Sequence, residues 1–280
     1  MRDLQFNLRS GGRWVEWLLL GLLSLFLLLP LIPLVLWSLA GHWPWPEVWP
    51  RQWSGKSWTY LFSPTGRAWE GLMNSWLVAC LTLLFNLFLG VPAARTLAMR
   101  RFRGRGLLFG LFLAPLFVPF TVTVMGMHLW MSRWPGEFLH ISVALAHLLP
   151  TLPYFIAILW YQYRLLGSHL QEAARTLGAS SWQIFRWVEL PLLWPGLAMG
   201  SVLVVLISLS QYVVTWVTSG GTLLTLPLLM FPFASSGKAS LVAVYSLWYM
   251  WPVLCLYLVY LWAAGRTQVP GRRRFARKRM

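Results

Sequence analysis

The chain alternates between long apolar runs and short polar segments that hold most of its charged residues. A membrane-spanning helix needs about 20 consecutive apolar residues, and several runs reach that length. The predicted transmembrane helices cover residues 18–39, 72–94, 107–131, 138–163, 195–217 and 239–264. Apolar side chains fill these runs continuously and do not alternate with polar ones, which excludes a β-barrel. The pattern predicts an all-α integral membrane protein of about six helices, a single transmembrane domain over residues 1–280.

One uncharged stretch, residues 190–237, is too long for a single membrane-spanning helix. A polar sequence at residues 219–222, with two adjacent glycines, interrupts it. The piece that follows, residues 223–233, contains Pro227 and Pro232. We expect this piece to form an external loop or a short re-entrant segment.

Composition supports a membrane protein and excludes two other classes. Hydrophobic residues make up 58% of the chain and charged residues 11%, against roughly 45–50% and 25% in soluble domains. The net charge of +16 would suit a basic nucleic-acid binder, but disordered binders of that kind have low hydrophobicity, whereas the mean hydropathy here is +0.61. We therefore expect no nucleic-acid partner.

The basic residues predict the orientation, because Lys and Arg are retained on the cytoplasmic side of short loops. Of the 23 basic residues, 18 fall at the N-terminus, in the segments 95–105 and 164–186, and in the tail from residue 266 onward. Both termini are therefore expected in the cytoplasm. The basic run within 271–279 follows the same rule, and it favours contact with anionic lipid head groups over nucleic acid.

The predicted cytoplasmic loop, residues 164–190, carries the pattern of a short amphipathic helix. Ser168 and Gln171 have the spacing of a capping box, and Gly178 stands where helices commonly end. The apolar positions between them follow helical spacing: Leu170, Ala173, Ala174 and Leu177.

A second short helix is expected directly after the first. Ser180 and Gln183 repeat the capping pattern. This helix should run towards Pro191, which would stop or kink it at the membrane.

The first helix of this loop has two possible roles. The small side chains of Ala173 and Ala174, with Gly178, would let another protein approach the backbone closely, and Glu172 offers a carboxylate to a partner's Arg or Lys. Amphipathic helices at a membrane surface also commonly lie on lipid alone. Composition leaves both roles open.

A resemblance to a known family distinguishes between them. Glu172, Ala173 and Ala174, followed by Gly178 and later by Leu190-Pro191, resemble the E-A-A loop in permease subunits of binding-protein-dependent ABC importers. Further matches to that family occur along nearly the whole chain and in the same order: Asn74-Ser75, Pro92-Ala93-Ala94-Arg95, Pro115 with Pro119, His147 with Pro150, Pro153 and Tyr154, and Thr225-Leu226-Pro227.

The resemblance implies the ABC importer permease fold and one half of a transport path in the bacterial cytoplasmic (inner) membrane. Its implied partners are a second, identical or different, permease subunit, two ATP-binding subunits, membrane lipid, and a periplasmic or lipid-anchored solute-binding protein. The chain has no Walker sequence, so the resemblance implies no enzyme activity and no directly bound cofactor, with ATP and Mg²⁺ on the partner subunits. The implied ATPase-coupling positions are Glu172, Ala173, Ala174, Leu177 and Gly178.

The fifth predicted helix carries the most polar sequence at membrane depth. Polar groups there commonly mark transport pathways, although Ser and Thr also simply hold helices together. The candidate pathway residues are Ser208, Ser210, Gln211 and Tyr212. Similar permeases for polyamines and ferric iron often have acids near this place, so the Ser-Gln sequence here fits a polar or anionic solute, or one selected mainly by the binding protein.

Other function classes lack the residues they need. A secondary transporter or channel without an ATPase remains the alternative, but proton coupling needs acids in the membrane, and all seven acids lie outside the predicted helices. His140 and His147 share a helix face and could form a metal or proton site; we expect structural hydrogen bonds instead, as for His128. No catalytic cluster or metal site is predicted. The resembling branch includes permeases for polyamines, ferric iron, thiamine, sulfate and phosphonates, and the sequence does not choose among them.

Overall fold

The computed structural model describes residues 8–44, 46–131 and 138–266. Glu137 and the basic run at 271–279 lie outside the described residues. The chain forms two compact units, one made of Met1–Arg67 with Met230–Trp248 and the other of Ala68–Leu229 with Tyr249–Met280. Each unit is described by itself.

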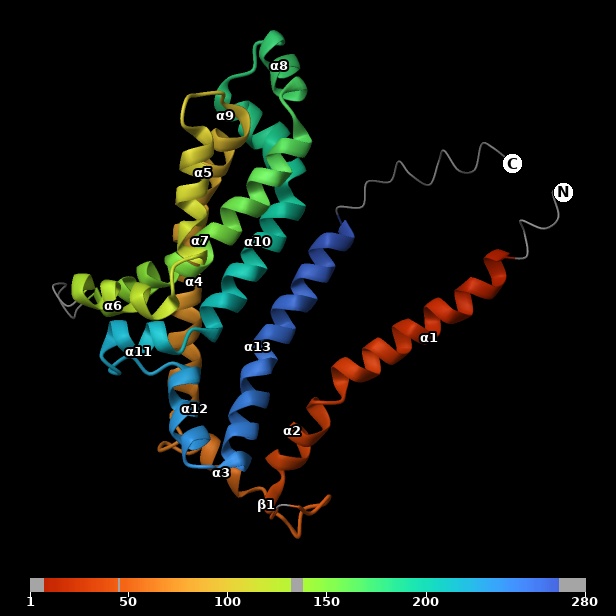
Figure 1. Ribbon diagram of the computed structural model, residues 1–280, viewed down its shortest axis with the longest axis vertical. Helices are drawn as coiled ribbons and strands as arrows, with labels where there is room; N and C mark the ends of the chain where they lie inside the picture. Colours follow the sequence, from red (N-terminus) through yellow and green to blue (C-terminus); the bar gives the residue numbers. More distant parts are fainter. Residues whose placement is uncertain (1–7, 45, 132–137, 267–280) are drawn as a thin grey trace. The chain divides into compact units, whose positions relative to one another are not determined.

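Three helices form the centre of the larger unit: α4 (Ala68–Met99), α7 (Leu139–Leu166) and α10 (Leu190–Ser210). They lie side by side in Figure 1 and share one apolar core. The buried core residues are Ala94, Leu97, Phe155, Ile156, Leu159, Tyr163, Leu193, Leu197 and Val204. Gly90 of α4 and Gly200 of α10 permit a close approach to Phe155, since a Cβ would lie 2.5 Å from its Cδ1 at Gly90 and 2.9 Å from its Cδ2 at Gly200. Glycine thus lets the Phe155 ring fill the space between two helix backbones.

Four helical segments in the described part of the chain are long and apolar enough to cross a membrane. They are Glu16–Ser38, Ala68–Met99, Leu139–Leu166 and Ser181–Ser210. The first comprises most of α1 (Leu8–Leu28) and α2 (Leu31–Ser38), which meet at Leu29 and Pro30. Shorter apolar helices accompany them, and α13 (Ala239–Arg266) continues to the end of the described residues. The coarse prediction of an all-α chain with long apolar helices is confirmed.

The segment predicted as one helix over 107–131 is broken. It consists of α5 (Arg105–Leu113), the 3₁₀ turn η1 (Ala114–Leu116) and α6 (Phe120–Met131). Pro115 and Pro119 explain the break, because proline lacks the N–H of the helical ladder and its ring clashes with the carbonyl four residues earlier. An apolar run of sufficient length therefore does not make one continuous helix here.

The segment predicted as one helix over 195–217 is also broken. α10 ends at Ser210, Gln211 adopts an extended conformation with φ −76° and ψ 93°, and α11 (Val213–Ser219) follows. The next segment, predicted as a loop or re-entrant piece, contains a helix, α12 (Leu226–Ser235). Gln211 thus lies in the break between α10 and α11, and its backbone is not helical.

The helix does not stop at Pro191, although a stop was one of the two outcomes predicted there, the other being a kink. A short helix, α9 (Ser181–Gln183), leads into the π-helical segment η3 (Ile184–Glu189), and the chain stays helical up to Ser210. Pro191 lies in the first turn of α10. The wider π-helical turn before it accommodates the proline ring, as π-bulges do at irregular points of helices. Glu189, expected outside the membrane-spanning helices, therefore lies inside a continuous helical segment that is long and apolar enough to cross a membrane, as Glu16 and Glu70 also do.

The smaller unit contains α1, α2, a short hairpin and α3 (Lys56–Leu61), together with the end of α12 and the start of α13. The hairpin strands β1 (Ala40–His42) and β2 (Gln52–Trp53) are antiparallel, with Ala40 opposite Trp53 and a register shift before His42. The Tyr245 hydroxyl donates to the carbonyl of Gly66, and the Ser240 hydroxyl donates to that of Ala40 at 2.7 Å. These two hydrogen bonds attach the start of α13 to the turn after α3 and to the hairpin, respectively.

Candidate functional site

The E-A-A segment forms an exposed helix, α8 (His169–Thr176). Glu172 and Ala173 are exposed, and Leu177, which follows the helix, is 87% exposed. Gly178 has a φ of +84°, a left-handed conformation in which glycine avoids the steric cost of a Cβ, and its N–H donates to the carbonyl of Arg175 at 2.9 Å. The five predicted coupling residues are therefore brought together on one exposed turn-and-helix unit.

Of the two predicted capping boxes, only the second is present. The Ser180 backbone N–H donates to the Gln183 side-chain oxygen at 2.7 Å, and the Gln183 N–H donates to the Ser180 hydroxyl at 3.3 Å. At the start of α8, by contrast, Ser168 makes no side-chain capping bond. Ser168 has a helical backbone conformation, with φ −94° and ψ −14°, whereas an N-cap side chain needs an extended one to reach the following N–H groups.

A buried ion pair fixes the end of this loop to the core. The carboxylate of Glu189 is fully buried and accepts hydrogen bonds from Arg95 Nη2 at 2.6 Å and Arg95 Nε at 3.2 Å. The Tyr163 hydroxyl donates to its other oxygen at 3.3 Å. Three elements, α4, α7 and η3, meet at this one carboxylate. Sequence reasoning did not find it, although Arg95 belongs to a family motif and Glu189 directly precedes Leu190-Pro191.

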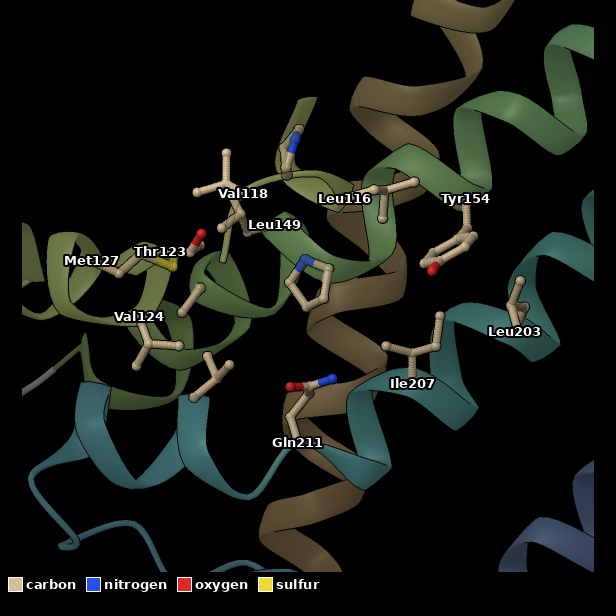
Figure 2. A pocket seen from close by; sticks show the side chains of 14 residues that line it. Leu116, Val118, Thr123, Val124, Met127, Leu149, Tyr154, Leu203, Ile207 and Gln211 are labelled. Carbon is tan, nitrogen blue, oxygen red and sulfur yellow. The ribbon is translucent and has the colours of Figure 1, made fainter. Parts of the chain in front are cut away.

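A largely apolar cavity of about 550 Å³ lies between α6, α7, α10 and α11. Its described lining contains no ionisable acid or base other than the weakly acidic phenol of Tyr154. Figure 2 shows the side chains of Gln211 and Tyr154 directed into this space, with Thr123 on the α6 side. The break at Gln211 places its amide here, since an extended residue turns the chain out of the α10 axis.

The other predicted pathway residues do not line this cavity. Ser208 is buried and bonded to His147, and the Ser210 hydroxyl donates to the Ile207 carbonyl at 2.8 Å. The Tyr212 ring stacks on that of Trp216, with centroids 6.4 Å apart. Their assignment to a pathway stays a prediction, and Gln211 is the member of the set that this cavity contains.

His147 is the centre of a buried hydrogen-bond network. Its Nδ1 lies 2.9 Å from the Ser208 hydroxyl and its Nε2 3.1 Å from the Thr215 hydroxyl, so one ring joins α7 to α10 and α11. The network continues into α4, because Thr151 donates to the His147 carbonyl and accepts from Asn86. The structural role expected for His147 is confirmed.

The other two histidines for which structural hydrogen bonds were predicted, His140 and His128, also have such partners. His140 Nε2 lies 3.2 Å from Asn74 Oδ1, and His128 Nδ1 lies 2.7 Å from the Val217 carbonyl oxygen. Within the described ranges, no three His, Cys, Asp or Glu side chains are grouped so that they could hold a metal ion.

Replacing His147 with leucine should lower the melting temperature of the purified protein. The buried Ser208 hydroxyl would lose its partner, and unsatisfied buried polar groups cost about 1–3 kcal/mol. Leucine at His140, which is half-buried and makes one side-chain hydrogen bond within the described residues, is the matched control and should cause a smaller decrease. Equal melting temperatures for both variants would contradict the importance of the network.

The comparisons with known proteins agree with this architecture. The family model described as "Binding-protein-dependent transport system inner membrane component" matches residues 71–268. The molybdenum transport system permease protein ModB of Escherichia coli K12 is 29% identical over 198 residues, which cover 63% of this chain and 86% of that protein. The putrescine transport system permease protein PotI of the same organism is 26% identical over 223 residues, covering 76% of this chain and 77% of that protein.

A solved structure supports the fold independently. The crystal structure of a bacterial ABC transporter involved in the import of the acidic polysaccharide alginate aligns with a TM-score of 0.62. The alignment covers 88% of this chain and 93% of that chain at 18% sequence identity. At that identity the match establishes the fold, and no more.

Proposed function

The chain belongs to the family of binding-protein-dependent transport system inner membrane components, and from this premise we propose that it forms half of the path for a small polar solute in an ATP-driven importer. Family membership makes it a multi-pass permease subunit of the inner membrane. It is not itself an ATPase, and it binds no cofactor, because ATP is held by a partner. The family also implies a binding protein in the same transport system.

The proposed assembly pairs this chain with a second permease subunit, two ATP-binding subunits and a periplasmic or lipid-anchored binding protein. Within it, we propose about six membrane crossings with both termini in the cytoplasm. The broken segment α5–η1–α6 would supply the third crossing. The one-sided distribution of 18 of the 23 basic residues supports this orientation.

We propose that α8 and Gly178 form the contact with the ATPase. Support comes from the exposure of Glu172 and Ala173 and from the lack of any ion-pair partner for Glu172 in the described part of the chain. A carboxylate left free in this way can pair with a basic side chain of another subunit. The Glu189–Arg95 pair would then transmit movement of the loop to α4.

We propose that Gln211 contacts the solute and that the solute is an oxyanion and not a cation. The position of its amide in the 550 Å³ cavity, at a break between two helices, is the observation that carries this assignment. A diamine would need carboxylates in the path, and the described lining has none. Of the solutes in the names of the two relatives above, molybdenum, as the oxyanion molybdate, suits a lining without carboxylates better than the diamine putrescine does.

The reconstituted complex should import molybdate in an ATP-dependent manner, and Gln211→Leu should reduce that uptake about tenfold, the effect of losing one good polar contact of about 1.4 kcal/mol. Radiolabelled uptake of molybdate and putrescine would be measured with the cognate binding protein. Ser235→Ala, at the end of α12 and outside both the cavity lining and the candidate pathway set, is the control and should retain wild-type uptake. Unchanged uptake in Gln211→Leu removes this residue from the path, and uptake of putrescine alone contradicts the solute class.

A further inference from the structure

An arginine-lined pocket lies at the end of α4, beside the start of α8. Its volume is about 350 Å³. We call it the arginine pocket. It is lined by Arg95, Thr96, Met99, Arg100, Ser168, Gln171, Glu172 and Arg175.

Hydrogen-bond donors in the arginine pocket lack acceptors. Gln171 is only 7% exposed, yet its side-chain nitrogen has no hydrogen-bond partner among the described residues. Arg100 and Arg175 have no ion pair or side-chain hydrogen bond in the part of the chain that the structure describes. Because a buried amide without a partner is costly, the orphaned Gln171 nitrogen points to a missing acceptor.

The charges and the helix geometry both favour an anion. Arg95 is already paired with Glu189, which leaves the charges of Arg100 and Arg175 in the lining against a single acid there, Glu172. Ser168 and Gln171 bring part of the start of α8 into the lining, and the unbonded backbone N–H groups at a helix start favour negative charge. Ser168 does not cap these groups with its side chain.

We propose that the arginine pocket binds a phosphate group. Guanidinium groups and backbone N–H groups at a helix start are donors suited to phosphate oxygens, and the Gln171 amide adds one more. The pocket lies where the long apolar helix α4 ends, and basic pockets at such ends bind anionic lipid head groups. The phosphate can therefore come from an anionic phospholipid or from free inorganic phosphate. This site does not depend on the proposed solute path.

The test uses the whole transporter complex, purified in detergent and stripped of lipid. Native mass spectrometry would measure binding of phosphatidylglycerol, phosphatidylcholine and inorganic phosphate. We expect phosphatidylglycerol or phosphate to bind, phosphatidylcholine to bind much less, and the double variant R100Q/R175Q to weaken binding about tenfold or more. R103Q removes a charge from the same segment outside the pocket lining and should bind as the wild type does.

A second variant keeps the test informative if the double variant does not assemble. Q171E has nearly the same shape as the wild type but replaces the donor with a negative charge, and it should also weaken binding. Competition of inorganic phosphate with phosphatidylglycerol identifies a free-anion site, whereas binding of phosphatidylglycerol alone identifies a lipid site. Equal binding by wild type, R100Q/R175Q and Q171E overturns the proposal. A second outcome also overturns the proposal: the wild-type complex binds neither phosphatidylglycerol nor phosphate, and the variants no longer co-purify with the ATPase. The pocket would then bind an acidic side chain of the ATPase and not a phosphate group.

Discussion

Replacing Arg95 with methionine is expected to lower the free energy of unfolding by about 3–5 kcal/mol. The change leaves the fully buried carboxylate of Glu189 with only the Tyr163 hydroxyl at 3.3 Å. Removing one partner of a buried pair leaves a charge that neither water nor a countercharge stabilises. The Arg95 side chain is 34% exposed, so the lower end of this range is the expected value. Thermal or urea denaturation of the purified permease complex would measure the loss.

A double-mutant cycle separates the interaction energy of the Arg95–Glu189 pair from other effects of replacing Arg95. Arg95→Met combined with Glu189→Leu removes both charges and should be more stable than Arg95→Met alone, because the buried charge has gone. Arg103→Met is the matched control, since this exposed arginine has no ion-pair partner in the part of the chain that the structure describes. Additive losses in the double variant would show that the two side chains do not stabilise each other.

The long helices were predictable and their interruptions were not. Apolar runs of sufficient length identified the positions of α4, α7 and α13, because bilayer thickness fixes the length of a spanning helix. A proline in a membrane helix does not always interrupt the helix, since neighbouring helices can form hydrogen bonds with the backbone groups that the proline leaves unpaired. Pro92 and Pro153 lie within continuous helices, whereas Pro115 and Pro119 coincide with a break. Sequence alone does not distinguish these cases.

The candidate site residues that could be predicted are those marked by residue types or spacings within one short segment of the sequence. Gln211 stood out by its polarity, and the exposed α8 by its spacing and glycine. The Arg95–Glu189 pair joins residues 94 positions apart, and only the packing of α4 against the loop brings them together. Tyr154 faces the cavity from an apolar helix, and such helices carry no polar stripe that would predict which side faces inward. Long-range pairing and helix rotation are therefore what the sequence left undetermined.

The largest functional effect is expected at Glu172. Glu172→Lys replaces the one carboxylate of α8 with a positive charge. The fold should stay intact, because the residue is exposed and has no ion-pair partner among the described residues. If Glu172 pairs with a basic residue of the ATPase, the reversal places two positive charges together and removes a charge-assisted contact. Solute uptake should then fall to background, while the subunit is still inserted in the membrane.

Two measurements and two further variants make this prediction specific. Co-purification of the ATPase tests assembly, and uptake by reconstituted vesicles tests coupling. Glu172→Gln keeps the shape but loses the charge, so it should retain part of the uptake, since a neutral hydrogen bond is about half as strong as a charged one. Glu16→Lys makes the same change in charge on an exposed residue of α1 and should leave uptake unchanged. If Glu172→Lys retains both the ATPase and wild-type uptake, α8 does not couple through this carboxylate, and the contact with the ATPase must rest on the small side chains and Gly178.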